Sequence, residues 1–323
     1  MKDWKNAIIK DKYWPNNFAP KGLDATNAML ENLTFAGPKL DGAKFNNATL
    51  KNIKFAAGGK AITKPWESDN YYRLSLQNAD FTGTVLEDVI FDGVDLSYAS
   101  FKGATLKNVV FTRYNSYDNT SLKYADFSDA NLENVKFRGG GCHRYLTSCI
   151  EANFTGATFK NVNFDDTYLD CASFKKAKMN NVSFKSAQLV ETKFSGAILE
   201  NVSFEYALLS KVSLKTVKIN NVNFQSTRLW GGVKVNSAGL AELLKRSYPG
   251  RPWRGRPVYE LLDQPELKDN LTEIIYDYNY RGDFCGEDYF ARMLISYLFS
   301  QTIADEKVYL GAKEILRSEG LID

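Results

Sequence analysis

Histidine and cysteine are scarce in this chain. Among its 323 residues there is one histidine, His143, and four cysteines, Cys142, Cys149, Cys171 and Cys285. The cysteines lack the close pair spacing of zinc sites, so we predict no metal site and no cofactor. Long apolar runs are also lacking, which excludes a membrane-spanning helix. The N-terminal stretch has lysines but no uninterrupted apolar core, so we expect no cleaved secretory signal.

An excess of charge of one sign is lacking as well. The chain has 41 Lys+Arg against 38 Asp+Glu, a net charge of +3. Residues 28–229 carry 24 basic and 20 acidic residues (+4), whereas 230–323 carry 12 and 15. Neither part has the clustered basic charge that supplies affinity for nucleic acid, so we do not expect direct nucleic-acid binding.

What the sequence does have is a five-residue repeat. Between residues 149 and 229 it recurs seventeen times without a break, as in ANFTG, ATFKN and VNFDD. The central residue is apolar, and the residue two positions earlier is small or β-branched. The phrase Asn-Val-x-Phe also returns every twenty residues, from Asn161–Phe164 to Asn221–Phe224. Because four steps restore the pattern, we predict a solenoid whose coils have four short sides.

The rest of the repeat region tests this prediction, because it contains the same phrase in shifted phases. When the phase breaks are treated as loops, the central residues sort into four columns. Side 1 then runs Phe35, Phe55, Phe91, Phe111, Phe137, Phe164, Phe184, Phe204, Phe224. Side 2 runs Leu40, Leu76, Leu96, Leu122, Cys149, Leu169, Leu189, Leu209, Leu229. Side 3 starts at Phe45 and Phe81, and side 4 at Leu30 and Leu50. We expect about nine coils, with Phe columns facing Leu columns.

The phrase Ala-Asp/Asn-Leu/Phe, as in Ala79-Asp80-Phe81 and Ala130-Asn131-Leu132, resembles the pentapeptide-repeat family. The resemblance covers residues 28–229. It implies a mainly β fold, a right-handed quadrilateral β-helix solenoid.

The segments on either side lack the repeat. We predict that residues 1–27 are a partly helical N-terminal cap, because the first coil of a solenoid needs a cover. Residues 230–323 contain apolar residues at helical spacing around 265–279, 286–301 and 304–319, which predicts a small C-terminal α-helical domain.

Three insertions, 56–71, 112–117 and 138–144, interrupt the repeat, and each begins after a central residue of side 1. We therefore expect them to emerge from one edge and to form one surface. Aromatic residues and arginine, which are enriched at protein-binding hot spots, are frequent in and beside them. The predicted partner-binding residues are Trp66, Tyr71, Tyr72, Arg113, Tyr114, Tyr117, Arg138, His143, Arg144 and Tyr145.

Candidates for chemistry are weak. Cys142 and His143 are adjacent in sequence and have no identifiable third partner, so we predict no catalytic residue there. Cys285 could be a thioester-forming nucleophile, or a small buried residue at a helix start. The paired carboxylates Asp165-Asp166 are expected to be surface residues. The asparagines that follow side 4 are expected to form a structural ladder.

The resulting hypothesis is a non-enzymatic module that binds a protein of unknown identity. The resemblance implies three roles. One is a bacterial effector that acts on a host protein; we expect the chain to be cytoplasmic, or to be delivered into a host cytosol by a secretion system that uses no cleaved signal peptide. A second is a modulator of DNA gyrase or topoisomerase, although such rods are strongly acidic. The third is the β-helix portion of a HECT-like ubiquitin ligase, which would use Cys285.

Overall fold

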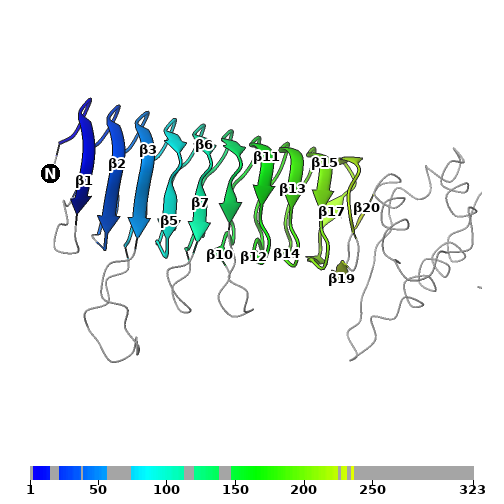
Figure 1. Cartoon of the computed structure of the whole chain (residues 1–323). Helices are drawn as coiled ribbons and strands as arrows, with labels where there is room; N and C mark the ends of the chain where they lie inside the picture. Colours follow the sequence, from blue (N-terminus) through cyan, green and yellow to red (C-terminus); the bar gives the residue numbers. More distant parts are fainter. Residues whose placement is uncertain are drawn as a thin grey trace, which may run out of the picture.

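The structure is a computed structural model, and it describes residues 3–14, 22–37, 39–56, 74–112, 120–137, 147–224, 227–230 and 234–235. Within these residues the regular elements are β-strands, and none is a helix. The helical domain predicted for 230–323 lies outside the described residues, apart from positions 230 and 234–235. The described part is a rod of stacked coils (Figure 1).

The strands are short because each coil turns a corner every five residues. In chain order they are β1 (Ile8–Trp14), β2 (Met29–Ala36), β3 (Thr49–Ala56), β4 (Val85–Glu87), β5 (Ile90–Asp92), β6 (Thr105–Lys107), β7 (Val110–Thr112), β8 (Asn131–Glu133), β9 (Lys136–Phe137), β10 (Thr147–Ser148), β11 (Thr158–Asn163), β12 (Thr167–Tyr168), β13 (Lys178–Ser183), β14 (Gln188–Val190), β15 (Ile198–Ser203), β16 (Leu208–Ser210), β17 (Ser213–Leu214), β18 (Lys218–Asn220), β19 (Arg228–Trp230) and β20 (Lys234–Val235).

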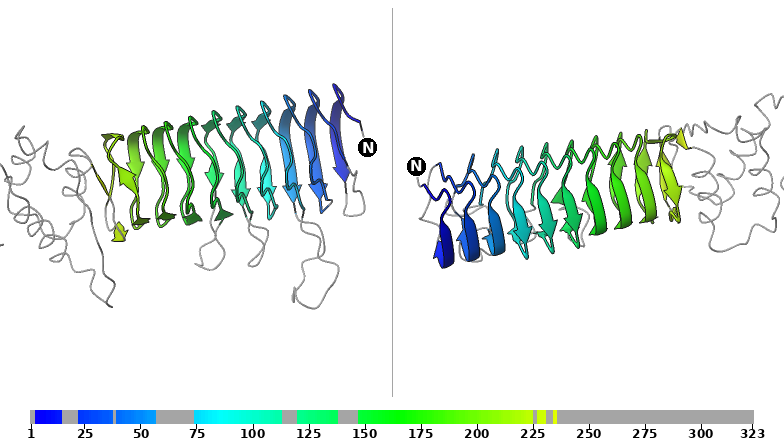
Figure 2. Two further views of the ribbon diagram at one scale, coloured as in Figure 1. Left: turned by 180° about the vertical axis from the view of Figure 1, so that it is seen from behind. Right: turned by 90° about the horizontal axis from the view of Figure 1, so that it is seen from above.

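All strand pairing is parallel and joins one coil to the next, as the side views show (Figure 2). A 13-stranded sheet covers sides 4 and 1, and a 5-stranded sheet covers the C-terminal part of side 2. Side 3 is held mainly by isolated bridges such as Asp80↔Ser100. The register pairs Phe55 with Phe91, and Phe91 with Phe111, which confirms the predicted four columns and about nine coils.

The core consists of these columns. Phe91 and Phe111 of side 1 stack with ring centroids 5.0 Å apart and planes 6° apart. Phe91 also meets Phe101 of side 3 at 6.2 Å and 88°, edge to face. The expectation that Phe columns face Leu columns is therefore wrong. Sides 1 and 3 lie opposite each other in a four-sided coil, so the two Phe columns fill the centre together, with both ring geometries favourable.

The corners carry the asparagine ladder. The residue two positions after each centre of side 4 has a positive φ, such as 55° at Asn108 and 56° at Asn161, a conformation that asparagine tolerates better than most residues. Asn161 donates to Oδ1 of Asn134 over 3.1 Å, and Asn181 donates to Asn161 over 2.7 Å. The structural interpretation of this column is confirmed.

Charged side chains form a second ladder on side 4. Along the rod, the residues that directly follow the side 4 centres alternate between positive and negative charge. Strand register places each of these residues opposite the corresponding residue of the next coil. They are Lys10, Glu31, Lys51, Glu87, Lys107, Glu133 and Lys160. The Lys10–Glu31 and Lys160–Glu133 pairs have N···O distances of 2.5 and 2.8 Å. A coil stacked one step out of place would bring like charges together.

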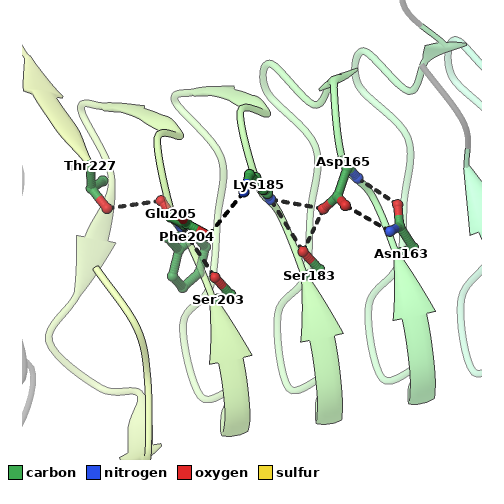
Figure 3. A network of polar contacts seen from close by, with 8 residues as sticks. All are labelled: Asn163, Asp165, Ser183, Lys185, Ser203, Phe204, Glu205 and Thr227. Atoms are coloured by element: carbon green, nitrogen blue, oxygen red, sulfur yellow. Dashed lines mark hydrogen bonds and ion pairs between the residues drawn. The ribbon is translucent and has the colours of Figure 1, made fainter. Parts of the chain in front are cut away.

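On side 1 the polar contacts also join neighbouring coils (Figure 3). Asp165 accepts hydrogen bonds from the Ser183 hydroxyl and, over 3.0 Å, from the Lys185 backbone N–H. Lys185 in turn pairs with Glu205 at 3.2 Å. Asp165 therefore stabilises the stack, in keeping with a surface role for this carboxylate.

Both ends of the solenoid differ from the sequence prediction. Residues 3–14 are not helical: β1 pairs in parallel with β2, so the stack begins one coil earlier than residue 28. Trp4 explains why the repeat was missed. Trp4 is buried beside Ala25, and the Trp4 ring centroid lies 6.3 Å from that of Phe35. Ala25 occupies the side 3 position at which later coils have phenylalanine. At the other end β19 and β20 still pair with the solenoid, beyond residue 229.

Candidate protein-interaction surface

The three insertions share one corner of the rod. The described chain stops after Ala56, Thr112 and Phe137, and resumes at Leu74, Thr120 and Thr147. Ala56 and Thr112, assigned to insertions from the sequence, are instead the last residues of β3 and β7. Each break lies between side 1 and side 2. Phe55, Phe111 and Phe137 of side 1 belong to one register column, joined through Phe91.

The ten predicted partner-binding residues lie outside the described residues. They are Trp66, Tyr71, Tyr72, Arg113, Tyr114, Tyr117, Arg138, His143, Arg144 and Tyr145. Cys142 and Cys285 lie outside as well. The structure thus fixes where the insertions are anchored.

Thr120 closes the base of the second insertion. Its buried hydroxyl donates toward the backbone oxygens of Thr112 and Phe91, the latter over 3.2 Å, and accepts from the Val94 N–H over 3.4 Å. Most inward positions of this kind hold alanine or valine, which have no such group. The hydroxyl joins the last residue before the insertion to the first described residue after it.

Asp92 lies between the bases of the first two insertions. Strand register places it opposite Ala56 on one side and Thr112 on the other. Its Oδ2 is 3.6 Å from Nζ of Lys54, whereas its buried Oδ1 has no hydrogen-bond partner among the described residues. Burial raises the pKa of this carboxyl above its ordinary value, and the Lys54 charge opposes the rise. The corner therefore holds a carboxylate that is only partly neutralised.

Two exposed tyrosines lie at the other end of side 2, at the corner that leads to side 3. Tyr98 and Tyr124 stack with ring centroids 4.7 Å apart and planes 6° apart, and 58% and 43% of each residue is exposed. Their φ angles are 62° and 60°, which is unusual for a bulky residue. Glu151, in the next coil, raises the pKa of the Tyr124 phenol by its charge. The same position has a positive φ in the later coils, as at Cys171 and Glu191, so the angle is a property of this turn, whereas the exposed ring pair is particular to these two coils.

Sequence analysis missed this pair, although the signal was present. Tyr98 and Tyr124 each follow a side 2 centre, Leu96 or Leu122, by two positions. The same offset that predicts the asparagine ladder therefore predicts that the two rings are neighbours. The three insertion bases and Asp92, with side 2 as far as the tyrosine pair, define the surface that we call the loop corner.

Neither cysteine of the described residues is suited to act as a nucleophile. Cys149 is buried and burial raises the pKa of its thiol; Cys171 is half-buried, and its thiol pKa is raised by burial and by the charges of Glu191 and Glu151. Both therefore favour the unreactive thiol form. No cluster of metal-ligating side chains occurs in the described part of the chain. Nor does that part contain a helix long and apolar enough to cross a membrane.

Four-sided coils, parallel register and five-residue steps define this protein as a β-solenoid of the quadrilateral type. A model of the pentapeptide repeat region matches residues 147–224, and a model of pentapeptide repeats matches residues 75–113 and 118–139. Residues 75–113, 118–139 and 147–224 of this chain thus match pentapeptide repeats.

Among solved structures the chain is similar to three further pentapeptide-type proteins. HetL, involved in heterocyst differentiation regulation in the cyanobacterium Nostoc sp. strain PCC 7120, is 20% identical; 70% of this chain and 86% of HetL are covered, with a TM-score of 0.26. QnrB1, a plasmid-mediated fluoroquinolone resistance protein, is 14% identical over 74% and 95%, with a TM-score of 0.29. A thylakoid-lumen protein of Arabidopsis thaliana is 20% identical over 39% and 69%, with a TM-score of 0.16. No curated protein matches the chain.

Proposed function

We propose that this chain is a non-enzymatic module that binds a partner protein through the loop corner. The observation that carries the proposal is the shared register of the three insertion bases, together with the exposed Tyr98–Tyr124 stack at the other end of side 2. A stacked solenoid holds such groups at fixed spacing, so little order is lost on binding. Tyrosine, tryptophan and arginine are the residues that dominate binding hot spots.

We propose further that the partner is a host protein and that the chain acts as a bacterial effector in a reducing cytosol. The resemblance of the repeat to effector rods supports the first part. The free thiols of Cys149 and Cys171 are in keeping with a reducing compartment.

The test is affinity capture from bacterial and host lysates with the full chain and with one variant. The variant carries Trp66→Ala, Tyr114→Ala and Arg144→Ala in the insertions. We expect it to lose the captured protein while its melting temperature stays within about 1–2 °C, since surface substitutions change stability little. Full retention by the variant would refute binding through the insertions.

The two alternative functions are tested in the same preparation. The gyrase alternative predicts that micromolar protein changes DNA supercoiling by gyrase. The repeat-region charge of +4 argues against a DNA-like rod. The ligase alternative predicts a ubiquitin thioester at Cys285 when charged E2 enzymes are added. We expect neither result, and either one would displace the interaction-module proposal.

A further inference from the structure

Side 3 changes its charge along the rod. Its N-terminal coils contain carboxylates, including Asp80, Asp126 and the exposed Asp129. From residue 173 to 218 the outward positions of side 3 and of the adjoining corner hold no carboxylate. They hold six exposed lysines, which we call the lysine surface: Lys175, Lys176, Lys178, Lys193, Lys215 and Lys218.

Strand register brings these lysines together. Ser173, Lys193 and Ser213 are successive partners on side 3, and Lys178, Ile198 and Lys218 are successive partners beyond the corner. Because neighbouring coils lie about 4.8 Å apart, the six ammonium groups belong to three coils that span about 10 Å along the rod. Such a cluster of like charges is a strong local field for an anionic partner.

Two nearby carboxylates contact other side chains, although Glu191 also attracts Lys193. Glu191 is paired with Lys211 at 2.8 Å, and Glu200 accepts a hydrogen bond from Asn180 over 3.0 Å. Within the described residues, Lys175, Lys176, Lys178 and Lys218 form no ion pair. Four of the six lysines thus present positive charge that no described carboxylate pairs with.

The chain leaves the solenoid on this same side. The last described strand, β20, pairs with β17, so that Leu214 lies opposite Val235. Further on, residues 260–288 contain nine acidic residues and two basic ones, Lys268 and Arg281, a net charge of −7. Four of the acidic residues, at 266, 269, 273 and 277, recur at helical spacing, which predicts one acidic face on the helix expected around 265–279.

We propose that the acidic segment 260–288 of this chain docks on the lysine surface. The charges are opposite, and the chain departs from the solenoid beside the lysines. The 24 residues from 236 to 259, taken as a flexible chain, span about 27 Å on average, more than the lysine surface requires. Tethering gives the segment a high effective concentration that a free polyanion lacks. Exposed ion pairs are individually weak, so docking depends on several of them and weakens with salt.

Zero-length carbodiimide crosslinking of the full chain tests this contact, since it joins a lysine only to a carboxylate that touches it. We expect crosslinks from Lys176, Lys178 and Lys193 to carboxylates within 260–288, with a yield at least five-fold lower at 0.5 M salt than at 0.05 M. Lys44 and Lys102 are the matched controls: they are exposed on side 3, but on its N-terminal coils, and should not crosslink to that segment.

Exchanging the charges between the two surfaces distinguishes a lost contact from a misfolded variant. Lys176→Glu with Lys178→Glu should reduce these crosslinks at least ten-fold, and adding Glu266→Lys with Glu273→Lys should restore crosslinking between the exchanged positions. Crosslinks from 260–288 to Lys245 in place of the lysine surface would overturn the proposal. Crosslinks found only between isotopically distinct copies would overturn it in favour of a second copy. A third outcome is that the lysine surface and the control lysines crosslink equally and that the full chain binds anionic vesicles or DNA. This outcome would overturn the proposal in favour of an external polyanion.

Discussion

At the scale of single residues, two buried polar groups, the Thr120 hydroxyl and one carboxylate oxygen of Asp92, lie at the insertion bases. Thr120 replaces the alanine or valine of most equivalent positions and uses its hydroxyl to join the two ends of an insertion. Asp92 lies between two insertion bases with one carboxylate oxygen lacking a partner among the described residues. The Thr120 hydrogen bonds stabilise the loop corner, whereas the partly buried Asp92 carboxylate lowers the stability of the fold there.

Replacing Thr120 with valine keeps the shape of the side chain and removes the hydroxyl. The Phe91 and Thr112 oxygens then lose a donor and the Val94 N–H loses an acceptor, so we expect unfolding to become easier by about 1–3 kcal/mol. Urea denaturation of the full chain measures this. Thr105→Val is the control, because Thr105 is exposed on side 4 and should change little. Equal effects of the two substitutions would contradict the role given to Thr120.

The Asp92 carboxyl makes stability depend on pH. Its pKa is raised in the folded state, so the charged form is disfavoured there, and stability falls as pH rises from the ordinary aspartate range of about 4 through the folded pKa. Asp92→Asn removes this loss. The variant should melt at a higher temperature than the parent at pH 7, and the difference should vanish near pH 3. A variant that melts lower at pH 7 would show that the Lys54 ion pair outweighs burial.

At the scale of coils, packing follows directly from the pentad, and that is why sequence reasoning succeeded there. The pentad places Cys149 at a side 2 centre and Cys171 two positions after the next one, and the first is buried whereas the second is half-buried. The sequence-based prediction was wrong where a coil departs from the five-residue pattern. The first two coils have Trp4 and Ala25 in place of the usual Phe at the side 3 centre, and the tyrosine stack lies at a corner position whose residue type the pentad does not restrict.

The charge ladder of side 4 makes a testable contribution to coil stacking. Glu133 lies in register between Lys107 and Lys160, and hydrogen bonding and attraction from Lys160 lower its pKa. Glu133→Lys would place three like charges in a row, whereas Glu133→Gln only removes one. We expect the lysine variant to have the lower melting temperature at low salt and the gap to close at 1 M salt, because exposed charges are screened. A gap that is independent of salt would exclude an electrostatic cause.

At the scale of the whole molecule, residues at a regular spacing in the sequence lie at a regular spacing along the rod. The shared corner of the insertions could be predicted, because the period places Phe55, Phe111 and Phe137 in one column. What the insertions do could not be derived from the same rule. They contain no repeat, so neither register nor column restricts their side chains. The charge difference between side 3 and the segment 260–288 likewise became visible only when the four sides were placed.

The central claim is that the loop corner, including the tyrosine stack, binds the partner. The most direct measurement is the dissociation constant of the captured partner for the full chain and for Tyr98→Asn/Tyr124→Asn, a change that suits the positive φ at both positions. The control is Tyr206→Asn, which alters another exposed tyrosine of positive φ outside the coils that carry the insertions. We predict at least ten-fold weaker binding for the double variant and unchanged binding for the control. Equal affinity of the double variant and the parent would contradict the account.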